Sequence, residues 1–491
     1  MWTKKLIYIT ILFITSISIN AQVDIRNIEF TGKVCDNKGS AITGVPVTDG
    51  YNIVVTNQKG EYRLLSNATA EFIYITIPSG YVIPMKDNSP YFYHRVDDKL
   101  KLKQKFDFIL EKSRQDENKH IVIVCADPQV GFDEEIPMVE EAIKDIKSLV
   151  AQNYANFPVH GVICGDIIAE ISREPKFFEW MKHTFAESNI PFFYAAGNHD
   201  MDVSGRSNHD SKKTFKNALG PTYYSFNRGK VHYIVLDDVF FIARGYASIG
   251  YLDEEQLCWL AQDLTLIPEG STVVTSFHIP TYSREARRGE AAKEEMNKVL
   301  QNRSTLYKML KPYNAYIFTG HEHYNENYQL ADNLFEHVHA ALCGIFWQAP
   351  YNSDGTPLGY AVYEFDGDKV KWYYKSVGKD KNYQFNAYLP GADKNRPDAV
   401  IANVWNYDPQ WKVHWYENGV KMGEMKQYTG WDPAIVHYVD KNRENFRYKY
   451  IGAGSTDHLF SAEPADKNAK ITIEVIDRFG NKYTDEAVKE E

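Results

Sequence analysis

The chain has 491 residues and a formal net charge of −10, a length that favours about three domains. The acidic balance, without a basic stripe, argues against nucleic-acid binding. The five cysteines are scattered without CxxC spacing, so they indicate no disulfide framework.

Residues 1–21 have the three parts of a secretory signal peptide. Met1–Lys5 is positively charged, Leu6–Ile19 is largely apolar, and Ala21 provides a small residue at a cleavage point. The apolar stretch is short for a transmembrane helix, and no later segment is apolar enough to span a bilayer. No cysteine stands at the cleavage point to carry a lipid. We therefore expect an exported protein, periplasmic or secreted, without a membrane span.

Residues 22–112 are predicted to form an all-β domain. Val45 and Val47 alternate with polar neighbours, 53–56 is rich in β-branched residues, and DG, KG and SG steps separate the runs. The stretch GKVCDNKGSAITGVPVTDGYNIVVTNQKGEYRL resembles the small transthyretin-like or carboxypeptidase-regulatory-like sandwich. A charged segment, EKSRQDENKH, follows as a linker.

Residues 113–350 change to an α/β pattern, in which short apolar runs alternate with helical periodicity. Val139, Ile143, Ile146 and Val150 recur at spacings of four, three and four, and therefore mark the buried face of one helix. The predicted strands are Ile121–Ala126, Val159–Cys164, Phe192–Ala196, Val231–Leu236, Val273–Phe277 and Ala315–Thr319.

Residues 351–491 return to a β-rich pattern. Trp411, Val413 and Trp415 alternate with polar residues, and Asn418-Gly419 predicts a tight hairpin turn. The run from Tyr360 to Tyr374 has two interpretations: it begins this C-terminal domain, or it completes the sheets of the preceding domain.

Potential metal ligands follow almost every predicted strand of the middle domain. The five strand ends lead into Asp127-Pro-Gln129, Gly165-Asp166, Gly197-Asn198-His199-Asp200, His278-Ile-Pro280 and Gly320-His321-Glu-His323. The carboxyl ends of strands form the ligand crevice of an open α/β sheet, so these side chains are expected to converge. A packed core would not gather such groups unsatisfied. Oxygen and imidazole donors together suit Mn, Fe or Zn.

The motifs D-x-Q, GD, GNHD, H-x-P and GHEH, in this order, resemble the calcineurin-like metallophosphoesterases. The resemblance spans Asp127 to His323, and the flanking β domains are similar to an exported bacterial subgroup. It implies a four-layered α/β/β/α sandwich, flanked here by two all-β sandwich domains, with two divalent transition-metal ions.

The resemblance also implies roles for individual residues. The first metal would be held by Asp127, Asp166 and His323, with Gln129 as a possible fourth ligand, and the second by Asp166, Asn198, His278 and His321. The unligated His199 would act on the substrate phosphate, together with Asn198. Asp200 would orient His199.

Two positions depart from the usual family pattern. Gln129 stands where D-x-H would have a histidine, so it either ligates the first metal, or touches its water, or has a structural role. Ala169 occupies the place where purple acid phosphatases have a tyrosine ligand, which argues against that branch.

Three further residues are candidates for substrate contact. Phe346 and Trp347 follow GHEH closely and could line the cleft for an aromatic or sugar ring, with core packing as the alternative. Arg284 could meet the substrate phosphate, or could belong to a solvated helix face.

The sequence thus predicts hydrolysis of a phosphomonoester or phosphodiester by in-line attack of a metal-bridging hydroxide. The substrate would be a small molecule or a glycan-linked or lipid-linked phosphoester. The alternative is a catalytically inactive surface or glycan-binding protein that keeps a structural metal site. The sequence indicates neither the oligomeric state nor the identity of the substrate.

Overall fold

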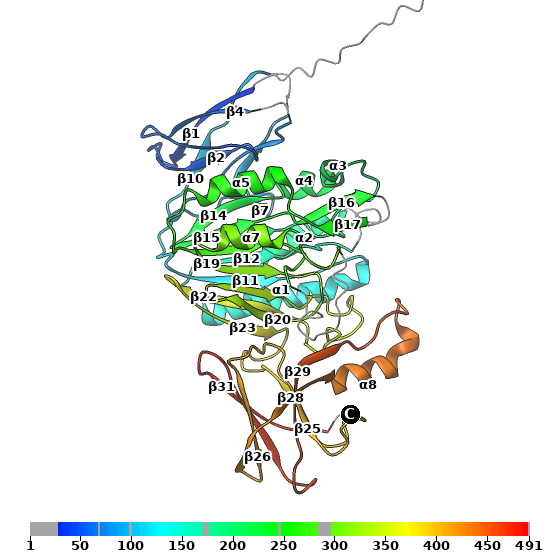
Figure 1. Ribbon diagram of the computed structural model, residues 1–491. Coiled ribbons are helices and arrows are strands. Elements are labelled where there is room, and N and C mark those ends of the chain that lie inside the picture. The colour runs from blue at the N-terminus through cyan, green and yellow to red at the C-terminus, as the bar shows by residue number, and fades with distance from the viewer. Residues whose placement is uncertain are drawn as a thin grey trace, which may run out of the picture.

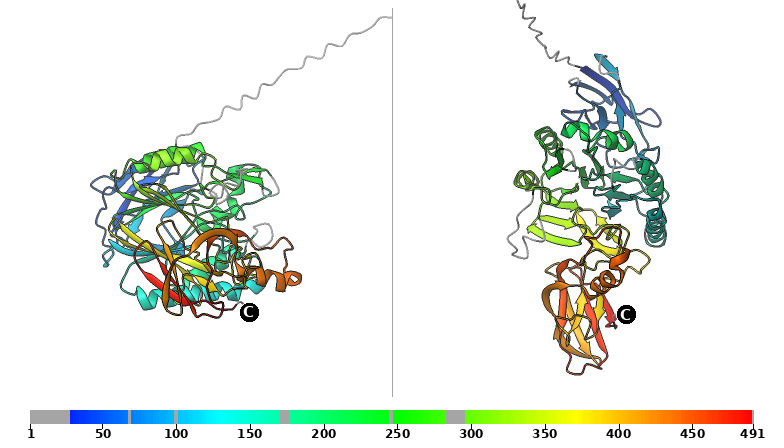
Figure 2. Two further views of the ribbon diagram at one scale, coloured as in Figure 1. Left: turned by 60° about the horizontal axis from the view of Figure 1, so that its bottom comes forward. Right: turned by 90° about the vertical axis from the view of Figure 1, so that its right-hand side faces the viewer.

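The computed structural model describes residues 28–66, 69–97, 101–169, 176–243, 247–282 and 296–489. An N-terminal β domain, a central α/β domain and a C-terminal β domain follow one another along the long axis of the molecule (Figure 1; Figure 2). The predicted signal peptide lies outside the described residues. Within them, no helix combines the length and the apolar character needed to cross a membrane.

The N-terminal domain consists of two small sheets and a short hairpin. One sheet has the order β10-β1-β4, with β9 also paired to β1, and the other has the order β3-β2-β5-β8. The strands are β1 (Ile28–Asp36), β2 (Pro46–Thr48), β3 (Ile53–Val55), β4 (Glu61–Ser66), β5 (Phe72–Ile75), β6 (Met85–Lys86), β7 (Ser89–Pro90), β8 (Tyr93–Arg95), β9 (Lys103–Lys105) and β10 (Phe108–Leu110). Alternate residues of β1 are buried, as expected for a strand that covers a core on one face.

The central domain is built on two larger sheets. The first has the order β13-β12-β11-β22-β23 and the second the order β14-β15-β18-β19-β21-β20, with β16-β17 as a separate hairpin. The strands are β11 (Lys119–Cys125), β12 (Val159–Ile163), β13 (Phe192–Tyr194), β14 (Tyr224–Arg228), β15 (Val231–Val235), β16 (Val239–Ala243), β17 (Ala247–Gly250), β18 (Thr272–Ser276), β19 (Asn314–Thr319), β20 (Glu326–Ala331), β21 (Leu334–Val338), β22 (Gly359–Asp366) and β23 (Lys369–Ser376). All six predicted strands are therefore present, with ends shifted by one or two residues.

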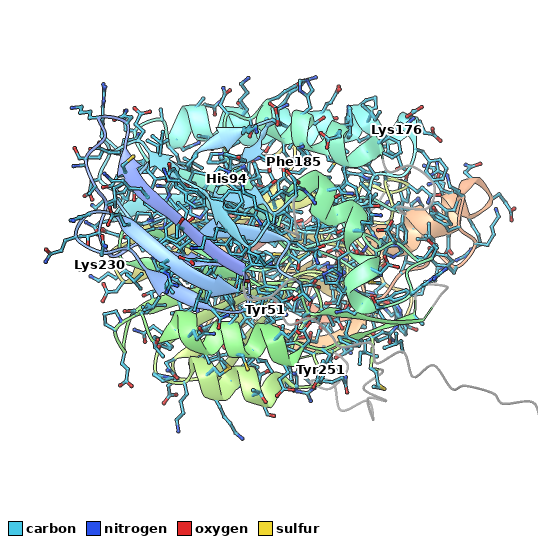
Figure 3. All side chains as sticks on the ribbon, turned by 90° about the horizontal axis from the view of Figure 1, so that it is seen from above. Tyr51, His94, Lys176, Phe185, Lys230 and Tyr251 are labelled. Carbon is cyan, nitrogen blue, oxygen red and sulfur yellow. The ribbon has the colours of Figure 1, made fainter. Side chains whose placement is uncertain are left out.

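Helices pack against both sheets: α1 (Ile136–Asn153), α2 (Lys176–Ala186) and α4 (Lys213–Leu219) against the first, and α5 (Glu254–Leu264) and α7 (Arg303–Leu310) against the second. The short helix α3 (Asn208–Ser211) lies beside β16. Seen from above, Lys176 and Phe185 of α2 lie on one side of the molecule, and Tyr251, just before α5, lies on the other (Figure 3). Val139, Ile143 and Ile146 are buried on one face of α1, as their spacing predicts, and the fourth predicted residue, Val150, is half-buried.

The alternation of side chains in β11 shows how the layers meet. Ile121 and Ile123 pack with α1 and α2, whereas Val122 and Val124 pack with residues of the second sheet such as Val274. Successive side chains of a strand point to opposite faces, so β11 has one face toward helices and one toward the other sheet. The four-layered α/β/β/α sandwich with flanking β domains is thus confirmed.

Residues 359–376 complete the central domain. β22 pairs antiparallel with β11 from Lys119↔Asp366 to Val124↔Ala361, and β23 pairs with β22. Of the two interpretations that the sequence leaves open for Tyr360 to Tyr374, this pairing selects the one in which the run completes the sheets of the central domain.

The C-terminal domain consists of two four-stranded sheets, β24-β25-β29-β28 and β27-β26-β30-β31. Its elements are β24 (Asn386–Tyr388), β25 (Val400–Asn403), β26 (Lys412–Glu417), β27 (Val420–Glu424), β28 (Lys426–Trp431), α8 (Pro433–Asn442), the 3-10 turn Arg443–Asn445, β29 (Ser455–Ala462), β30 (Ile471–Ile476) and β31 (Lys482–Glu486). Asn418 and Gly419 join β26 to β27 with φ of 50° and 82°, the left-handed conformation of the predicted tight turn.

Candidate metal centre

The ends of five parallel strands meet at one edge of the central domain. β11, β12 and β13 run parallel in the first sheet, and β18 and β19 run parallel in the second. Because the two sheets face each other, the residues after these strands share one small volume. The structure brings together there Asp127, Gln129, Asp166, Asn198, His199, His278, His321 and His323.

One group of donors surrounds His278, which is fully buried. Its Nε2 lies 3.3 Å from Oδ2 of Asp166, 3.0 Å from Oδ1 of Asn198 and 3.1 Å from Nδ1 of His321. Its Nδ1 is 2.9 Å from the carbonyl oxygen of Cys164, which fixes the ring and leaves Nε2 toward the other donors. The ligand atoms of Asp166, His278 and His321 all lie within 4.8 Å of one another.

A second group lies on the other side of Asp166. Nε2 of His323 is 3.6 Å from Oδ1 of Asp127, and Nε2 of Gln129 donates to Oδ2 of Asp166 at 3.0 Å. The Gln129 oxygen faces Sγ of Cys343 at 3.6 Å. With the amide in this orientation Gln129 supports Asp166, and a half-turn of the amide would direct its oxygen into the group of donors.

These separations fit metal ions. Two donor atoms that each lie about 2.1 Å from one ion are roughly 3.0–3.4 Å apart in octahedral or tetrahedral geometry. The donor separations of 3.0, 3.1, 3.3 and 3.6 Å fall at or near this range. Carboxylate, amide and imidazole donors in this number suit two borderline divalent ions with Asp166 between them.

Metal binding requires neutral imidazoles and charged carboxylates, and the pKa values of His321, His323 and Asp166 suit it. Burial alone would lower the pKa of His278, but the carboxylates of Asp166 and Asp127 raise that pKa to about 10, so a cation would have to displace its proton. Burial and the nearby His278 lower the pKa of His321 to about 3, and burial lowers the pKa of His323 to about 4. Burial alone would raise the pKa of Asp166, but His278 and His199 beside it hold that pKa well below its usual value. Asp127 and Asp166 are buried close together, and burial and this neighbour raise the pKa of Asp127. Divalent cations would relieve the repulsion between the Asp127 and Asp166 carboxylates.

The backbone is strained at the same place. Positive φ values occur at Asp127 (47°), Gln129 (36°), Asp166 (51°), His321 (70°) and His323 (55°). A non-glycine residue in the left-handed region costs about 1–3 kcal/mol and persists only where its surroundings fix it. Strain at five candidate ligands therefore indicates that function, rather than local stability, determines these turns.

Glycines before the ligands allow the turns to approach one another. A Cβ on Gly197 would lie 2.0 Å from the backbone nitrogen of Asp166, and one on Gly320 would lie 2.4 Å from Oδ2 of Asp127. Any larger residue at these positions would separate the strand ends. This explains the glycine in the GNHD and GHEH motifs.

Asp200 has a different role from the predicted one. Its fully buried carboxylate accepts hydrogen bonds from the backbone N–H groups of Ile167 (3.0 and 3.2 Å), Ile168 (3.2 Å) and Gly197 (2.8 Å). Both oxygens thus hold the turn that carries Asp166, instead of orienting the ring of His199. Sequence adjacency suggested the imidazole as the partner, but the hydrogen bonds of the Asp200 carboxylate go to backbone N–H groups.

Asp238 supports the second sheet in the same way. Its buried carboxylate accepts from the N–H of His278 (3.1 Å) and of Ile279 (3.2 and 3.0 Å). Glu336, also buried, accepts from the N–H of Thr281 at 2.6 Å. Each of the two turns that carry Asp166 and His278 is therefore fixed by a buried acid. In the sequence, the Asp237-Asp238 pair at the end of a predicted strand was the pattern that could have indicated this role for Asp238. No sequence pattern indicated the role of Glu336.

His199 stands beside the donors without joining them. Its backbone N–H donates to Oδ1 of Asp166 at 2.9 Å, and its Nε2 lies 4.0 Å from Oδ2 of the same residue. One third of its side chain is exposed, whereas Asp166 is buried. The imidazole therefore faces the open side of the site, where a substrate would enter.

The three candidate substrate residues have different positions. Phe346 borders the site, with its ring centroid 5.2 Å from that of His323. Trp347 is buried, and its Nε1 donates to the carbonyl of Pro128 at 2.8 Å, so core packing, the alternative, describes it better than substrate contact. Arg284 lies outside the described residues.

The C-terminal domain contributes an aromatic wall that the sequence did not predict. A pocket of about 90 Å³ is lined by Gln129, Gly131, Phe132, Ala169, His199, Phe346, Tyr448 and Tyr450. The rings of Tyr448 and Tyr450 are stacked at 5.5 Å, and Tyr448 meets Phe346 at 5.4 Å. The two tyrosines follow Phe346 by about a hundred residues and carry no motif, so local patterns could not place them here.

Three family models match successive parts of the chain. They describe the N terminal of Calcineurin-like phosphoesterase at residues 28–113, Calcineurin-like phosphoesterase at residues 120–325, and the C terminal of Calcineurin-like phosphoesterase at residues 336–483. The chain belongs to the calcineurin-like phosphoesterases. Members of this family use dinuclear divalent metal centres, and the donors described above fit such a centre.

Two curated relatives are similar to this calcineurin-like chain. Purple acid phosphatase 15 of Arabidopsis thaliana is 29% identical over 247 residues, which cover 46% of this chain and 38% of the relative. An uncharacterised protein of Schizosaccharomyces pombe is 25% identical over 33% of this chain and 45% of the relative. The chain thus spans less than half of either relative. Ala169, which stands where purple acid phosphatases have a tyrosine ligand, lines the pocket beside His199. The chain is nevertheless similar to a purple acid phosphatase.

Two solved structures are similar to part of this chain. A dimetal phosphatase of Danio rerio has a TM-score of 0.38 at 14% identity, covering 53% of this chain and 97% of that chain. A purple acid phosphatase from yellow lupin has a TM-score of 0.35 at 12% identity, covering 53% and 52% respectively.

Proposed function

We propose that this protein is a metal-dependent phosphoesterase that hydrolyses phosphomonoesters or phosphodiesters outside the cytoplasm. The observation that supports this most is the position of Asp166, whose carboxylate lies between two groups of buried donors, with the exposed side of His199 next to it. A merely structural metal site has no use for an unligated imidazole that faces the entrance.

The residues divide between two ions. Asp127, Asp166, His323 and, after a half-turn of its amide, Gln129 would hold one ion, and Asp166, Asn198, His278 and His321 would hold the other. The metal pair supplies water that is nucleophilic near neutral pH and charge that neutralises the phosphate. The backbone N–H of His199 and the amide of Gln129 keep Asp166 in place between the two groups.

His199 is proposed to act on the substrate itself. Its ring reaches the open side of the site, so it can donate a hydrogen bond to a phosphate oxygen or a proton to the leaving oxygen. Asn198 directs its Oδ1 toward His278, which leaves its amide nitrogen as a second donor for the phosphate. Together they would stabilise charge that develops on the phosphoryl oxygens.

The aromatic wall supports a substrate with a ring next to the phosphate. Tyr450 is 72% exposed at a pocket shared with His199 and Gln129, and a ring stacked there would cover it. Arg447 fixes this wall because its guanidinium lies 2.7 Å from carboxylates of both Glu134 and Glu135. We therefore propose an aryl, nucleoside or sugar phosphoester rather than a small alkyl phosphate.

The extracytoplasmic location is supported by the charged start, apolar stretch and small residue within 1–21. Mass spectrometry of the protein recovered from its native host tests it. A mature N-terminus at Gln22 would support export, and an intact Met1 in a cytoplasmic fraction would contradict it.

Hydrolysis is tested with the metal-loaded protein on aryl phosphates and bis-aryl phosphodiesters. Asp166→Ala and His278→Ala should each lower kcat/KM by roughly a thousandfold or more, since each removes charge stabilisation at the reacting phosphate. His209→Ala is the matched control, because His209-Asp210 mimics the GNHD motif while the exposed His209 ring pairs with Glu71. Activity at the level of the unmodified protein in all three variants would refute the proposal. Bound metal without turnover in the unmodified protein would also refute it, and would favour the inactive binding protein.

A further inference from the structure

A second cluster of potential ligands lies where the central domain meets the C-terminal domain. Glu326 is the first residue of β20, and Asp457 and His458 lie in β29. Their ligand atoms are all within 4.8 Å of one another. Glu326 and His458 are completely buried, and Asp457 is partly buried. None of these residues belongs to the metal centre described above.

The imidazole of His458 is the informative member of this cluster. Its side chain is 1% exposed, and neither ring nitrogen has a hydrogen-bond partner. Burial of a polar group without a hydrogen bond is costly, so such groups usually have a partner that completes them. The ring therefore points to a ligand that accepts its lone pair.

The spacing around His458 matches the spacing of the metal centre. Its Nε2 lies 3.4 Å from Oε2 of Glu326, longer than a good hydrogen bond. The corresponding separation between His278 Nε2 and Asp166 Oδ2 is 3.3 Å. Both values fall within the roughly 3.0–3.4 Å expected between neighbouring ligands of one ion with metal–ligand bonds of about 2.1 Å.

An irregularity in β29 explains how two consecutive residues join the cluster. Tyr428 pairs with Leu459 and Gly430 pairs with Thr456, so β28 advances two residues while β29 advances three. The extra residue falls at Asp457 and His458. A β-bulge of this kind redirects a side chain, whereas in a regular strand two successive residues would point to opposite faces.

The surroundings hold Glu326 rigidly against the C-terminal domain. Nδ2 of Asn325 donates to the carbonyl of Trp405 at 2.9 Å, and Nδ2 of Asn327 donates to the carbonyl of Asn406 at 3.1 Å. The residues on both sides of Glu326 are therefore bound to the other domain. A further buried carboxylate, that of Asp354, lies near His458.

We propose that Glu326, Asp457 and His458 bind an additional divalent cation of the Zn²⁺ or Mn²⁺ type, which joins the C-terminal domain to the catalytic domain. One imidazole nitrogen with two carboxylates is a donor set typical of these ions. Ca²⁺ fits less well, because it prefers six to eight oxygen ligands. The cation would replace the missing partner of His458 and neutralise the adjacent carboxylates.

The test counts ions bound to the full-length mature chain. The protein is stripped with chelator, loaded with Zn²⁺ or Mn²⁺, desalted and analysed by inductively coupled plasma mass spectrometry. We expect three ions per chain in the unmodified protein. The double variant Asp166→Asn, His321→Gln should keep about one ion, since only the metal centre is disabled. Two ions in the unmodified protein and none in the double variant would overturn the proposal, whether or not the protein is a phosphoesterase.

A single substitution locates the additional ion. His458→Gln should lose one ion of the three, and His437→Gln, an exposed histidine of the same domain on α8, should lose none. In the double-variant background, added Zn²⁺ should raise the thermal unfolding midpoint, and His458→Gln should abolish that rise. An ion count and a midpoint shift that do not depend on His458 would show adventitious binding and contradict this site.

Discussion

The role of Asp200 offers a sharp test, because sequence and structure assign it different partners. If it orients the His199 ring, as its position in GNHD suggests, its loss affects turnover alone. If it holds the turn of Asp166, as its hydrogen bonds show, its loss affects stability and metal affinity. The substitution Asp200→Asn changes one atom and separates these outcomes.

The size of the effect follows from the number of donors that lose their acceptor. Asp200→Ala would leave three buried N–H groups unsatisfied, at about 1–3 kcal/mol each. That sum approaches the roughly 5–15 kcal/mol that stabilises a typical domain, so the alanine variant is too severe. Asp200→Asn keeps one oxygen for Ile167 and Ile168 but turns an NH₂ group toward the N–H of Gly197. We expect a loss of about 1–3 kcal/mol in the free energy of unfolding.

The assay combines urea denaturation, metal affinity by chelator competition, and kcat for Asp200→Asn, His199→Ala and the double variant. We expect Asp200→Asn to lower stability and to weaken metal binding. Its effect on kcat and that of His199→Ala should multiply in the double variant, because Asp200 and His199 act separately. Asp202→Asn is the matched control: Asp202 lies on the same loop and accepts from Thr214 N–H at 2.8 Å, away from the ligands. Unchanged metal affinity in Asp200→Asn, with no further loss of kcat once His199 is absent, would refute this reasoning.

Three other predictions concern Glu336, Tyr450 and Gln129. Burial raises the pKa of Glu336 from 4.5 to about 8, so between pH 4.5 and pH 8 the folded chain keeps a proton that the unfolded chain loses. The free energy of unfolding should therefore fall by about 1.4 kcal/mol for each unit that the pH rises within this range. Urea denaturation at pH 5 and pH 8 should show a smaller fall in Glu336→Gln, and equal falls would contradict the shift. Tyr450→Ala should raise KM for an aryl phosphate roughly threefold to tenfold and leave KM for a small alkyl phosphate unchanged. The control Trp431→Ala removes an exposed ring outside the pocket and should change neither KM value. Gln129→His should tighten binding of the more weakly held ion by about tenfold, since imidazole is a stronger ligand than an amide; weaker binding in a chelator titration would assign Gln129 only to the support of Asp166.

The elements of the central domain could be predicted from local sequence patterns. Apolar runs marked the strands, the spacing of Val139, Ile143 and Ile146 marked α1, and the rule that ligands gather at the carboxyl ends of strands placed Asp127 beside His323. These features depend on neighbours in sequence or on general topology. They could therefore be derived without coordinates.

The features that were missed depend on contacts between distant segments. Tyr448 and Tyr450 reach the site because Phe446 and Ile451 on either side are buried among residues of α8 and Ile345. Nothing in their local sequence indicates that contact. The partners of Asp200 were misassigned because hydrogen bonds follow the direction of the turn rather than adjacency. The same holds for the strained φ values at the ligands, which only the assembled site can maintain.

The central claim is that two ions share Asp166, and X-ray diffraction from metal-loaded crystals at the absorption edge of the metal tests it most directly. The account predicts two anomalous peaks about 3.5–4 Å apart with the Asp166 carboxylate between them, His278 and His321 at one and His323 at the other. One peak at the strand ends, or none within bonding distance of Asp166, would contradict it.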